Sequence, residues 1–297
     1  MENLGYYNGK TGPIEEMRVP MDDRSSWFGD GVYDATISVE HIPYALEEHI
    51  DRFFKSMALL EIEPDFTRED LAALLPSLVK QVDSPVQMVY WQVTRGTAPR
   101  AHAFPRGAKP NLWVFLRPWE TAAGKAGDPA RGQKLITVED TRFFHCNIKT
   151  LNLIPNVLAA EKAGKAGCDE AVFHRSGRVT ECSHSNVHIL KDGVFRTAPE
   201  DNLILAGIGR AHAIARCGEL GIPVDRTPFS VAEMMAADEV LITSSGVFCP
   251  AVSHIDGRPV GGRDPALAGR LRGALIGELW DYIAARGGQA DYTKYML

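Results

Sequence analysis

The sequence has few cysteines, no long apolar run and no marked excess of charge. Its 297 residues include five cysteines, which are scattered, odd in number and form no C-x-x-C pair. This usage argues against a disulfide framework or a cysteine zinc site and is typical of reduced thiols in the cytoplasm. The apolar runs are too short to cross a membrane. The first residues, "MENLGYYNGK", lack the apolar core of a signal peptide.

Basic and acidic residues nearly balance along the chain. Lys plus Arg number 32 and Asp plus Glu number 38, so the formal net charge is −6. A mildly acidic protein is not expected to have nucleic acid or an anionic membrane as its main partner. Apolar residues make up 45% and charged residues 24%, as in ordinary globular proteins. The length allows one large or two medium domains with a sizeable core.

Several motifs of catalysis and binding are absent or incomplete. The run "GIGRAH" lacks the third glycine of a dinucleotide-binding fingerprint, and no G-x-S-x-G nucleophile elbow occurs. His184 and His188 lie four residues apart in "SHSNVHIL", which predicts a strand rather than a helix. On a strand that spacing separates the two rings too far to share a metal ion, so we predict no metal site.

The element pattern predicts a mixed α+β fold with two domains. Alternating and β-branched runs predict strands at 31–39, 86–96, 111–118, 135–140, 169–181, 186–198 and 238–246, with hairpin turns at 8–9 and near 256–257. Helical spacing predicts helices at 46–60, 71–82, 150–165, 206–221 and 265–286, with Pro76 interrupting the second. We expect domains over residues 1–119 and 134–286, a Gly- and Pro-bearing linker over 120–133, and a loosely held tail over 287–297.

One lysine stands alone in an apolar stretch. Lys149 is the only charged residue of "CNIKTLNLIPNV", residues 146–157. Such a side chain can lay its stem on apolar surface and keep its ammonium in water. Alternatively, removal from water lowers the pKa of an amine, and a neutral amine can form a Schiff base with a carbonyl. The stretch by itself does not separate these two readings.

Other features would suit a ligand with a phosphate and a basic ring. "LAGIGRAHA" places residues 207–209 at a helix start, where free N–H groups bind anions. "ITSSG" adds the hydroxyls of Ser244 and Ser245 at a strand end, and Glu181 offers a carboxylate after a turn. Pyridoxal phosphate has the three groups that such features would bind: an aldehyde for a lysine, a phosphate and a ring nitrogen.

These residues lie in an ordered set of motifs that resembles the class IV, or fold-type IV, pyridoxal-phosphate transaminases. The motifs are "FGDGVYDATI", "EEHIDRF", "NIKTLNLIPNVLAA", "DEAVFHRSGRVTECSHSNVHIL", "DNLILAGIGR" and "DEVLITSS". They run from about Tyr6 to Arg272, in order and at nearly constant spacing. The resemblance implies a two-domain α+β enzyme that holds pyridoxal 5'-phosphate between its domains.

The resemblance also implies roles for particular residues. The lysine that carries the cofactor, and that becomes the general base for the substrate Cα proton, falls on Lys149. The carboxylate that faces the pyridine nitrogen falls on Glu181, and the arginine that clamps the phosphate falls on Arg52. Further cofactor contacts, from backbone N–H groups, hydroxyls and an apolar side chain beneath the ring, fall on Leu205, Ile208, Gly209, Ser244 and Ser245.

The stretch "RGTAPRAH" decides the branch of the family. Its Arg100 and His102 resemble the R-x-H pair with which D-amino acid transaminases trap the substrate α-carboxylate, and Tyr33 matches a tyrosine of the same trap. The pattern implies that the pair reaches the neighbouring subunit's site, and hence a homodimer. D-alanine and 2-oxoglutarate are the expected substrates. An aminodeoxychorismate lyase, a branched-chain aminotransferase or an (R)-amine transaminase on the same scaffold stays open as an alternative.

Some positions depart from the family pattern. Gly209 replaces a threonine, which removes one hydroxyl from the expected phosphate site but leaves the backbone N–H. Asp34 stands where glutamate is common, and Asn147 stands where aspartate is usual. These changes bear on substrate range and cofactor affinity more than on the class of reaction.

Overall fold

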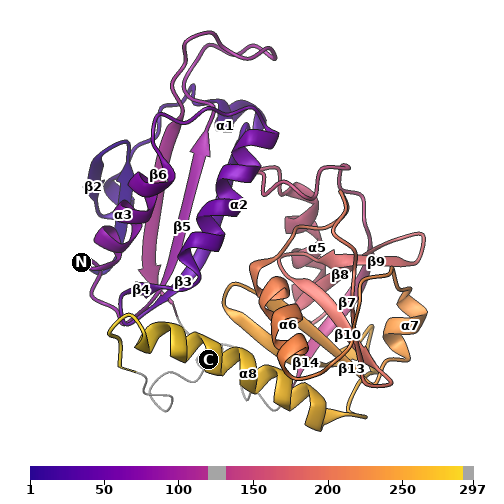
Figure 1. Cartoon of the computed structure of the whole chain (residues 1–297). Helices are drawn as coiled ribbons and strands as arrows, with labels where there is room; N and C mark the ends of the chain where they lie inside the picture. Colours follow the sequence, from indigo (N-terminus) through magenta and orange to yellow (C-terminus); the bar gives the residue numbers. More distant parts are fainter. Residues whose placement is uncertain (120–131, 290–297) are drawn as a thin grey trace. The chain divides into compact units, whose positions relative to one another are not determined.

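The structure is a computed structural model that describes residues 1–119 and 132–289 (Figure 1). Its contacts divide the chain into two compact units. Of the described residues, the first unit contains 1–119, the short segment Ile148–Asn152 and residues 281–289. The second contains residues 132–147 and Leu153–Trp280. Most of the expected linker and of the expected tail lies outside the described residues.

An antiparallel six-stranded sheet forms the centre of the first unit (Figure 1). In spatial order its strands are β2 (Lys10–Gly12), β1 (Leu4–Tyr7), β6 (Asn111–Pro118), β5 (Val86–Thr94), β3 (Gly31–Val39) and β4 (Ile42–Pro43). The hairpin predicted at 8–9 is confirmed, and both Asn8 and Gly9 have positive φ, as a tight hairpin turn requires. The strands predicted at 31–39 and 111–118 have the bounds expected from their residues.

Helices α1 (Arg24–Phe28), α2 (Leu46–Leu59) and α3 (Arg68–Val79) and a short 3₁₀ turn, η1 (Ile14–Glu16), accompany this sheet. The predicted apolar spacing of α2 buries Ile50, Phe53 and Met57 in the core of the unit. Helix α3 is not interrupted: Pro76 lies inside it. The loss of one backbone hydrogen bond at a proline is offset here because Leu75 and other residues of the helix are buried in the same core.

A mixed nine-stranded sheet forms the second unit. Its main path runs β12 (Val224–Asp225), β11 (Val194–Thr197), β10 (Asn186–Lys191), β13 (Glu239–Ser244), β14 (Val247–Ile255), β7 (Gln133–Glu139), β8 (Glu170–Arg175) and β9 (Arg178–Cys182), and β15 (Arg258–Pro259) pairs with β14. Strands β7, β8 and β14 pair in parallel, whereas most neighbours are antiparallel. The fold is therefore α+β, as predicted.

Helices α5 (Ile154–Lys165), α6 (Ile208–Glu219), α7 (Val231–Met235) and α8 (Pro265–Ala284) complete the chain. The prediction that α5 begins at Thr150 was wrong, because the helix begins only at Ile154, with Pro155 in its first turn. The helix does not start at Thr150 because Thr150 and Leu151 pair with β3: Thr150 forms a bridge with Val32, and the N–H of Leu151 donates to the carbonyl of Gly31 at 3.1 Å.

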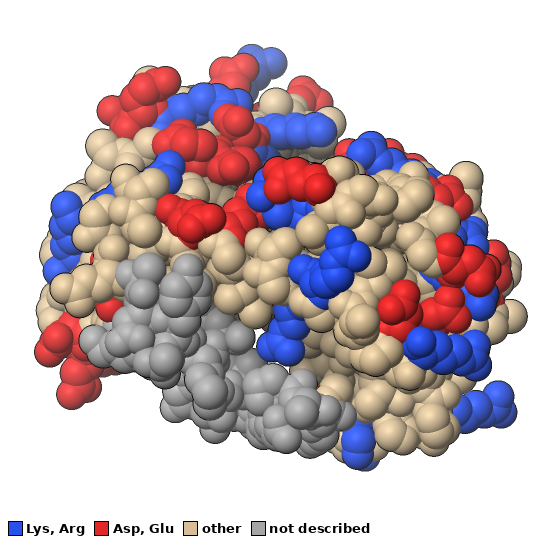
Figure 2. Space-filling view, turned by 60° about the horizontal axis from the view of Figure 1, so that its bottom comes forward, with Lys and Arg blue, Asp and Glu red and all other residues tan. Residues whose placement is uncertain are grey.

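Charges of both signs are interspersed on the face of the molecule shown in Figure 2. This distribution fits the near balance of charge in the sequence and shows no broad basic patch on that face. Among the helices of residues 1–119 and 132–289, none combines the length and the apolar content needed to cross a membrane.

The two histidines of "SHSNVHIL" have separate surroundings. His188 is fully buried in β10, where its ring nitrogens lie 2.9 Å from the hydroxyls of Thr197 and Thr243. Burial, assisted by the nearby positive charge of Arg210, lowers the pKa of His188 to about 3. His184 is mostly exposed and pairs with Glu170. His188 is therefore a neutral, hydrogen-bonded core residue.

The buried His188 gives the second unit a pH dependence that can be measured. Its pKa is lower in the folded than in the unfolded chain, so below about pH 6.5 the unfolded chain binds more protons and stability falls as the pH falls. We predict that His188→Gln reduces the loss of unfolding free energy between pH 6 and pH 4 by about 2 kcal/mol. Urea unfolding at both pH values measures this difference.

The exposed His184 supplies a matched control for that experiment. His184→Gln should leave the difference in unfolding free energy between pH 6 and pH 4 close to that of the unsubstituted protein, since the His184 side chain is mostly exposed. Equal effects of the two substitutions would contradict the assignment to His188.

Candidate active site

The main chain holds Lys149 against strand β3. The N–H of Tyr33 donates to the carbonyl of Lys149 at 2.9 Å, and the N–H of Lys149 donates to the hydroxyl of Ser56 on α2 at 3.3 Å. Gly31 of β3 is confined on both sides, because an added Cβ would lie 2.5 Å from the backbone oxygen of Val93 and 2.8 Å from a methyl group of Leu151. The backbone of the lysine is thus held by β3 on one side and by the Ser56 hydroxyl of α2 on the other, although the lysine precedes a helix rather than belonging to one.

The side chain of Lys149 is half-buried and lies over an aromatic ring. Its Nζ is 4.4 Å from the centroid of the Tyr33 ring. Tyr33 in turn stacks on Tyr90 of β5, with centroids 5.3 Å apart and an interplanar angle of 20°. An aromatic face stabilises a nearby ammonium and restricts where the side chain can point. The structure therefore brings together the lysine and the tyrosine that the sequence singled out.

A buried charged cluster lies between β3 and α2. The carboxylate of Asp34 accepts hydrogen bonds from Nδ1 of His49 at 2.8 Å and from Nη2 and Nε of Arg52 at 2.7 and 2.9 Å. Both Asp34 and His49 are fully buried. Burial raises the pKa of Asp34, but the charge of Arg52 and the hydrogen bonds from His49 and Arg52 outweigh it, so the pKa lies well below its usual value. The carboxylate is therefore ionised and pairs with the guanidinium.

His49 completes this cluster as a neutral ring. Burial lowers its pKa, although Asp34 opposes the change. With Nδ1 donating to Asp34, Nε2 is an acceptor, and no hydrogen-bond partner for it is found among the described residues. His49 stands in the motif "EEHIDRF", but the sequence assigned it no role, because it meets Asp34 only through the packing of α2 on β3.

The predicted carboxylate trap lies on a loop after β5. The guanidinium of Arg100 lies 5.2 Å from the centroid of the Phe28 ring, and the imidazole of His102 lies 5.2 Å from the same ring. Both side chains are exposed. Within the part of the chain that the structure describes, no hydrogen bond or ring contact joins either of them to Tyr33 or Lys149.

The predicted carboxylate partner of a ring nitrogen, Glu181, is buried at the end of β9. Its Oε2 accepts from the N–H of Leu205 at 2.9 Å and from Nδ2 of Asn186 at 3.2 Å. Its Oε1 accepts from Nη1 of Arg142 at 2.5 Å. These donors fix both carboxylate oxygens and bring Glu181 next to Leu205, as the sequence predicted for one ligand site.

Arg142 was missed by the sequence reasoning. Its guanidinium makes two hydrogen bonds to Asp140 and one to Glu181, and it lies 4.5 Å from the centroid of the Phe173 ring. Although burial opposes it, the bonds to Asp140 and the charge of Glu181 raise the pKa of Arg142 further. The available signal for Arg142 in the sequence was an acidic residue, Asp140, followed two positions later by the arginine, at the end of a predicted strand.

The start of α6 and the end of β13 lie side by side. A Cβ added at Gly209 would be 2.7 Å from the carbonyl oxygen of Ser244, so the glycine permits this close approach. Gly207 is equally confined, by the side chain of Asn186. No side chain of the described residues caps the helix N-terminus. Its N–H groups and the Ser244 region therefore form a compact set of donors suited to an anion.

The predicted site residues fall into two groups, one in each unit. The first unit contains Tyr33, Arg52, Arg100, His102 and Lys149, and the second contains Glu181, Leu205, Ile208, Gly209, Ser244 and Ser245. Within the first unit, Tyr33 and Lys149 lie together, while Arg100 and His102 share a different aromatic support.

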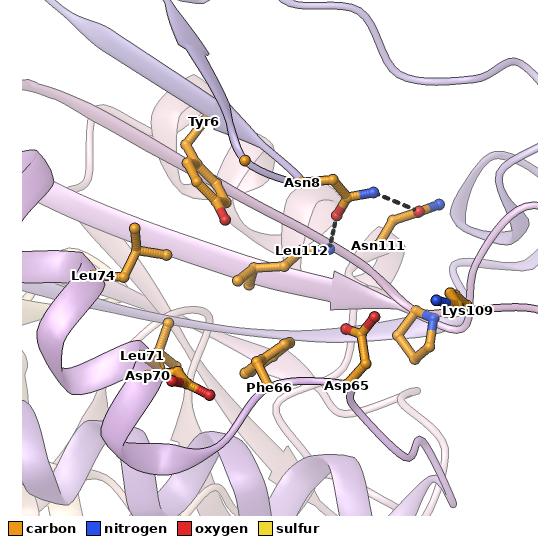
Figure 3. A pocket seen from close by; sticks show the side chains of 12 residues that line it. Tyr6, Asn8, Asp65, Phe66, Asp70, Leu71, Leu74, Lys109, Asn111 and Leu112 are labelled. Atoms are coloured by element: carbon orange, nitrogen blue, oxygen red, sulfur yellow. Dashed lines mark hydrogen bonds between the residues drawn. The ribbon is translucent and has the colours of Figure 1, made fainter.

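A separate cavity of about 590 Å³ lies in the first unit (Figure 3). It is lined by residues such as Tyr6, Phe66, Leu71 and Leu112, and none of the predicted site residues lines it. Its amide groups are already used: Asn8 donates to Asn111 at 2.9 Å and accepts from the N–H of Leu112. We therefore do not assign the chemistry of the site to this cavity.

Comparison with known proteins gives consistent relatives. Residues 31–255 match the family model of amino-transferase class IV. The D-alanine aminotransferase of Listeria monocytogenes serotype 4b is 40% identical over 94% of this chain and 96% of its own. That of Bacillus licheniformis is 36% identical over 87% and 90%. The branched-chain amino acid aminotransferase of T.th., solved with pyridoxamine 5'-phosphate, has a TM-score of 0.84 and 26% identity over 93% of each chain.

These findings confirm the family predicted from the motifs, its fold type and its cofactor. The family match spans most of the chain, and the relatives cover nearly all of it. The chain belongs to the class IV aminotransferases, enzymes of fold type IV that depend on pyridoxal 5'-phosphate.

Proposed function

We propose that this enzyme transfers the amino group of a D-amino acid, D-alanine first among them, to a 2-oxo acid such as 2-oxoglutarate. One observation carries the proposal: Arg100 and His102 are presented together on the ring of Phe28. This pair distinguishes the D-amino acid branch in the resemblance described above. The similarity to proteins named D-alanine aminotransferase supports the same reading.

Each unit offers groups that fit a part of pyridoxal 5'-phosphate. When bound, this cofactor supplies an aldehyde that condenses with amines and a pyridinium ring that accepts an electron pair from Cα. Lys149 offers the amine for the aldehyde. Glu181 offers a fixed carboxylate for the ring nitrogen, and the start of α6 with Ser244 and Ser245 offers donors for the phosphate. We also assign Arg52 to the phosphate and Leu205 to the face of the ring.

Lys149 is the proposed general base. Its Nζ takes the proton from the substrate Cα. Tyr33 keeps the amine on one side, 4.4 Å from its ring, and the neutral His49 adds no positive charge to repel it. A base fixed on one face of the bound substrate can remove the Cα hydrogen of only one enantiomer. The fixed position of the Lys149 amine therefore gives a preference for D- or L-amino acids.

Glu181 is proposed to hold a proton on the ring nitrogen of the cofactor. Arg142, Asn186 and the N–H of Leu205 hold its carboxylate in one orientation. Arg142 also compensates the charge of Glu181 in the buried setting. Asp140 binds the same Arg142 guanidinium. The Glu181 carboxylate therefore cannot rotate without breaking several charge-assisted hydrogen bonds.

A homodimer is part of the proposal. Ile154, Val157 and Leu158 of α5 are 70%, 57% and 58% exposed and lie on one face of the helix. An exposed apolar face of this kind favours burial against another chain. In a dimer, Arg100 and His102 would serve the partner subunit's site. We also place the enzyme in the cytoplasm, on the evidence of its five free cysteines.

The spectrum of the cofactor tests the proposed reaction directly. We predict that the enzyme with pyridoxal 5'-phosphate loses its aldehyde absorbance on adding D-alanine and keeps it on adding L-alanine. Addition of 2-oxoglutarate should then restore it. A response to L-leucine instead would favour a branched-chain aminotransferase, and pyruvate released from aminodeoxychorismate would favour a lyase.

Lys149→Ala should lower transamination by about a thousandfold or more, because the base and the covalent anchor are both removed. The fold should persist, as circular dichroism would report. Lys80→Ala, at an exposed position at the end of α3, is the matched control and should keep full activity. Retention of activity in the Lys149 variant would reject the assignment.

Arg100→Ala should raise the KM for D-alanine by about tenfold or more, since a charge-assisted contact to the carboxylate is lost, and should change kcat much less. Mixing this variant with Lys149→Ala tests the dimer. Each mixed dimer would contain one complete site, so at low D-alanine an equal mixture should recover about a quarter of the original activity. No recovery after subunit exchange would contradict action across the dimer.

A further inference from the structure

The loop that carries Arg100 and His102 is held through its backbone by one buried arginine. Nη1 of Arg24 donates to the carbonyl of Ala101 at 2.7 Å and to that of Ala103 at 3.4 Å. Nη2 donates to the carbonyl of His102 at 3.4 Å. One guanidinium thus gathers three consecutive carbonyl groups around the exposed His102 side chain.

Arg24 itself is buried and held by an ion pair with Asp30. It is 2% exposed, and its Nε donates to Asp30 at 2.7 Å. Asp30 also accepts from Nε of Arg95 at 2.9 Å, and the other nitrogens of Arg95 donate to the carbonyls of Leu60 and Glu61 at the end of α2. The carboxylate therefore links the loop to the core of the first unit through two guanidinium groups.

The short helix that begins with Arg24 also ends with the aromatic support of the trap. Phe28 contacts the Arg24 guanidinium at 4.9 Å, and the side chains of Arg100 and His102 each lie 5.2 Å from its ring. Asp23 caps the helix through Ser25 and accepts from the buried Thr94 hydroxyl at 2.8 Å. One short element therefore fixes both the backbone and the side chains of the trap.

We infer that Arg24 is a positioning residue for substrate recognition: it sets the conformation of the 100–103 loop and so aims Arg100 and His102 at the substrate carboxylate. Arg24 does not touch the substrate and acts only through the loop. The inference deepens the proposed function, on which its kinetic part rests. An arginine is required because a lysine at this position can pair with Asp30 but cannot also reach three carbonyl groups with a planar fork.

The kinetic test compares a substrate that has the carboxylate with one that lacks it. Arg24→Lys and Arg24→Met are measured with D-alanine and with D-alaninol, in which a hydroxymethyl group replaces the carboxylate. We expect the KM for D-alanine to rise about tenfold, with kcat within about twofold, and both constants for D-alaninol to change less than about twofold. Equal losses on the two substrates would show a general structural defect and overturn the inference.

A double-mutant cycle asks whether Arg24 acts through Arg100. Once Arg100→Ala has removed the trap, adding Arg24→Met should raise the KM for D-alanine by less than about twofold further. Fully additive effects would overturn the inference. Arg18→Met is the matched control, because Arg18 also donates to two backbone carbonyls, of Glu15 and Met17, but lies outside the loop.

A readout that needs no activity separates this inference from the proposed function. Trypsin cleaves after Arg100 only when the loop leaves its held conformation. Cleavage there should be about fivefold faster or more in Arg24→Met than in the unsubstituted enzyme or Arg18→Met. Unchanged cleavage overturns the positioning role. Faster cleavage in an enzyme that is inert to D-alanine would support the positioning of the loop and reject the proposed substrate.

Discussion

The pairing of residues 148–152 with strand β3 is the constraint on which the rest of the structure depends. The chain on either side of this segment belongs to the second unit, yet these five residues are part of the first. Backbone bonds from Tyr33 and to Gly31 hold them there, and Gly31 leaves room for the contact. As a result Lys149 is positioned by the main chain, and its side chain is left free to react.

Buried ion pairs orient candidate site groups within each unit. In the first unit Asp34 is bound by Arg52 and His49, and in the second unit Glu181 is bound by Arg142. Breaking such a pair would leave an uncompensated buried charge, which is costly. Each pair therefore fixes one orientation of a polar group. Arg24 and Asp30 follow the same rule beneath the loop that presents Arg100 and His102.

Much of the fold could be predicted from the sequence because the apolar periodicity of its elements is strong. Strand β3 has the bounds expected from its residues, and helix α8 begins where expected, at Pro265, and ends two residues early, at Ala284. The start of α5 could not be predicted, since helical spacing near Thr150 was overridden by pairing with a strand more than a hundred residues earlier. Pro76 stayed within α3 because its neighbours are buried.

The candidate site, too, could be predicted from the sequence only in part. Lys149, Glu181 and the glycines at the start of α6 stand in local motifs, and these motifs taken together indicated a cofactor. His49, Arg142 and Arg24 gained their meaning only from partners distant in the sequence: Arg142 lies 39 residues from Glu181, and Arg24 lies 77 residues from Ala101. No local pattern encodes such pairs, and the relation between them appears only once the chain is folded.

Chemical capture of the cofactor tests the role of Lys149 most directly. The enzyme, saturated with pyridoxal 5'-phosphate, is reduced with borohydride, digested and analysed by mass spectrometry. We predict a phosphopyridoxyl group on the Nζ of Lys149 and on no other lysine. A peptide containing Lys149 that remains unmodified, or a label that settles on a different lysine, would contradict the assignment of this lysine as the covalent anchor.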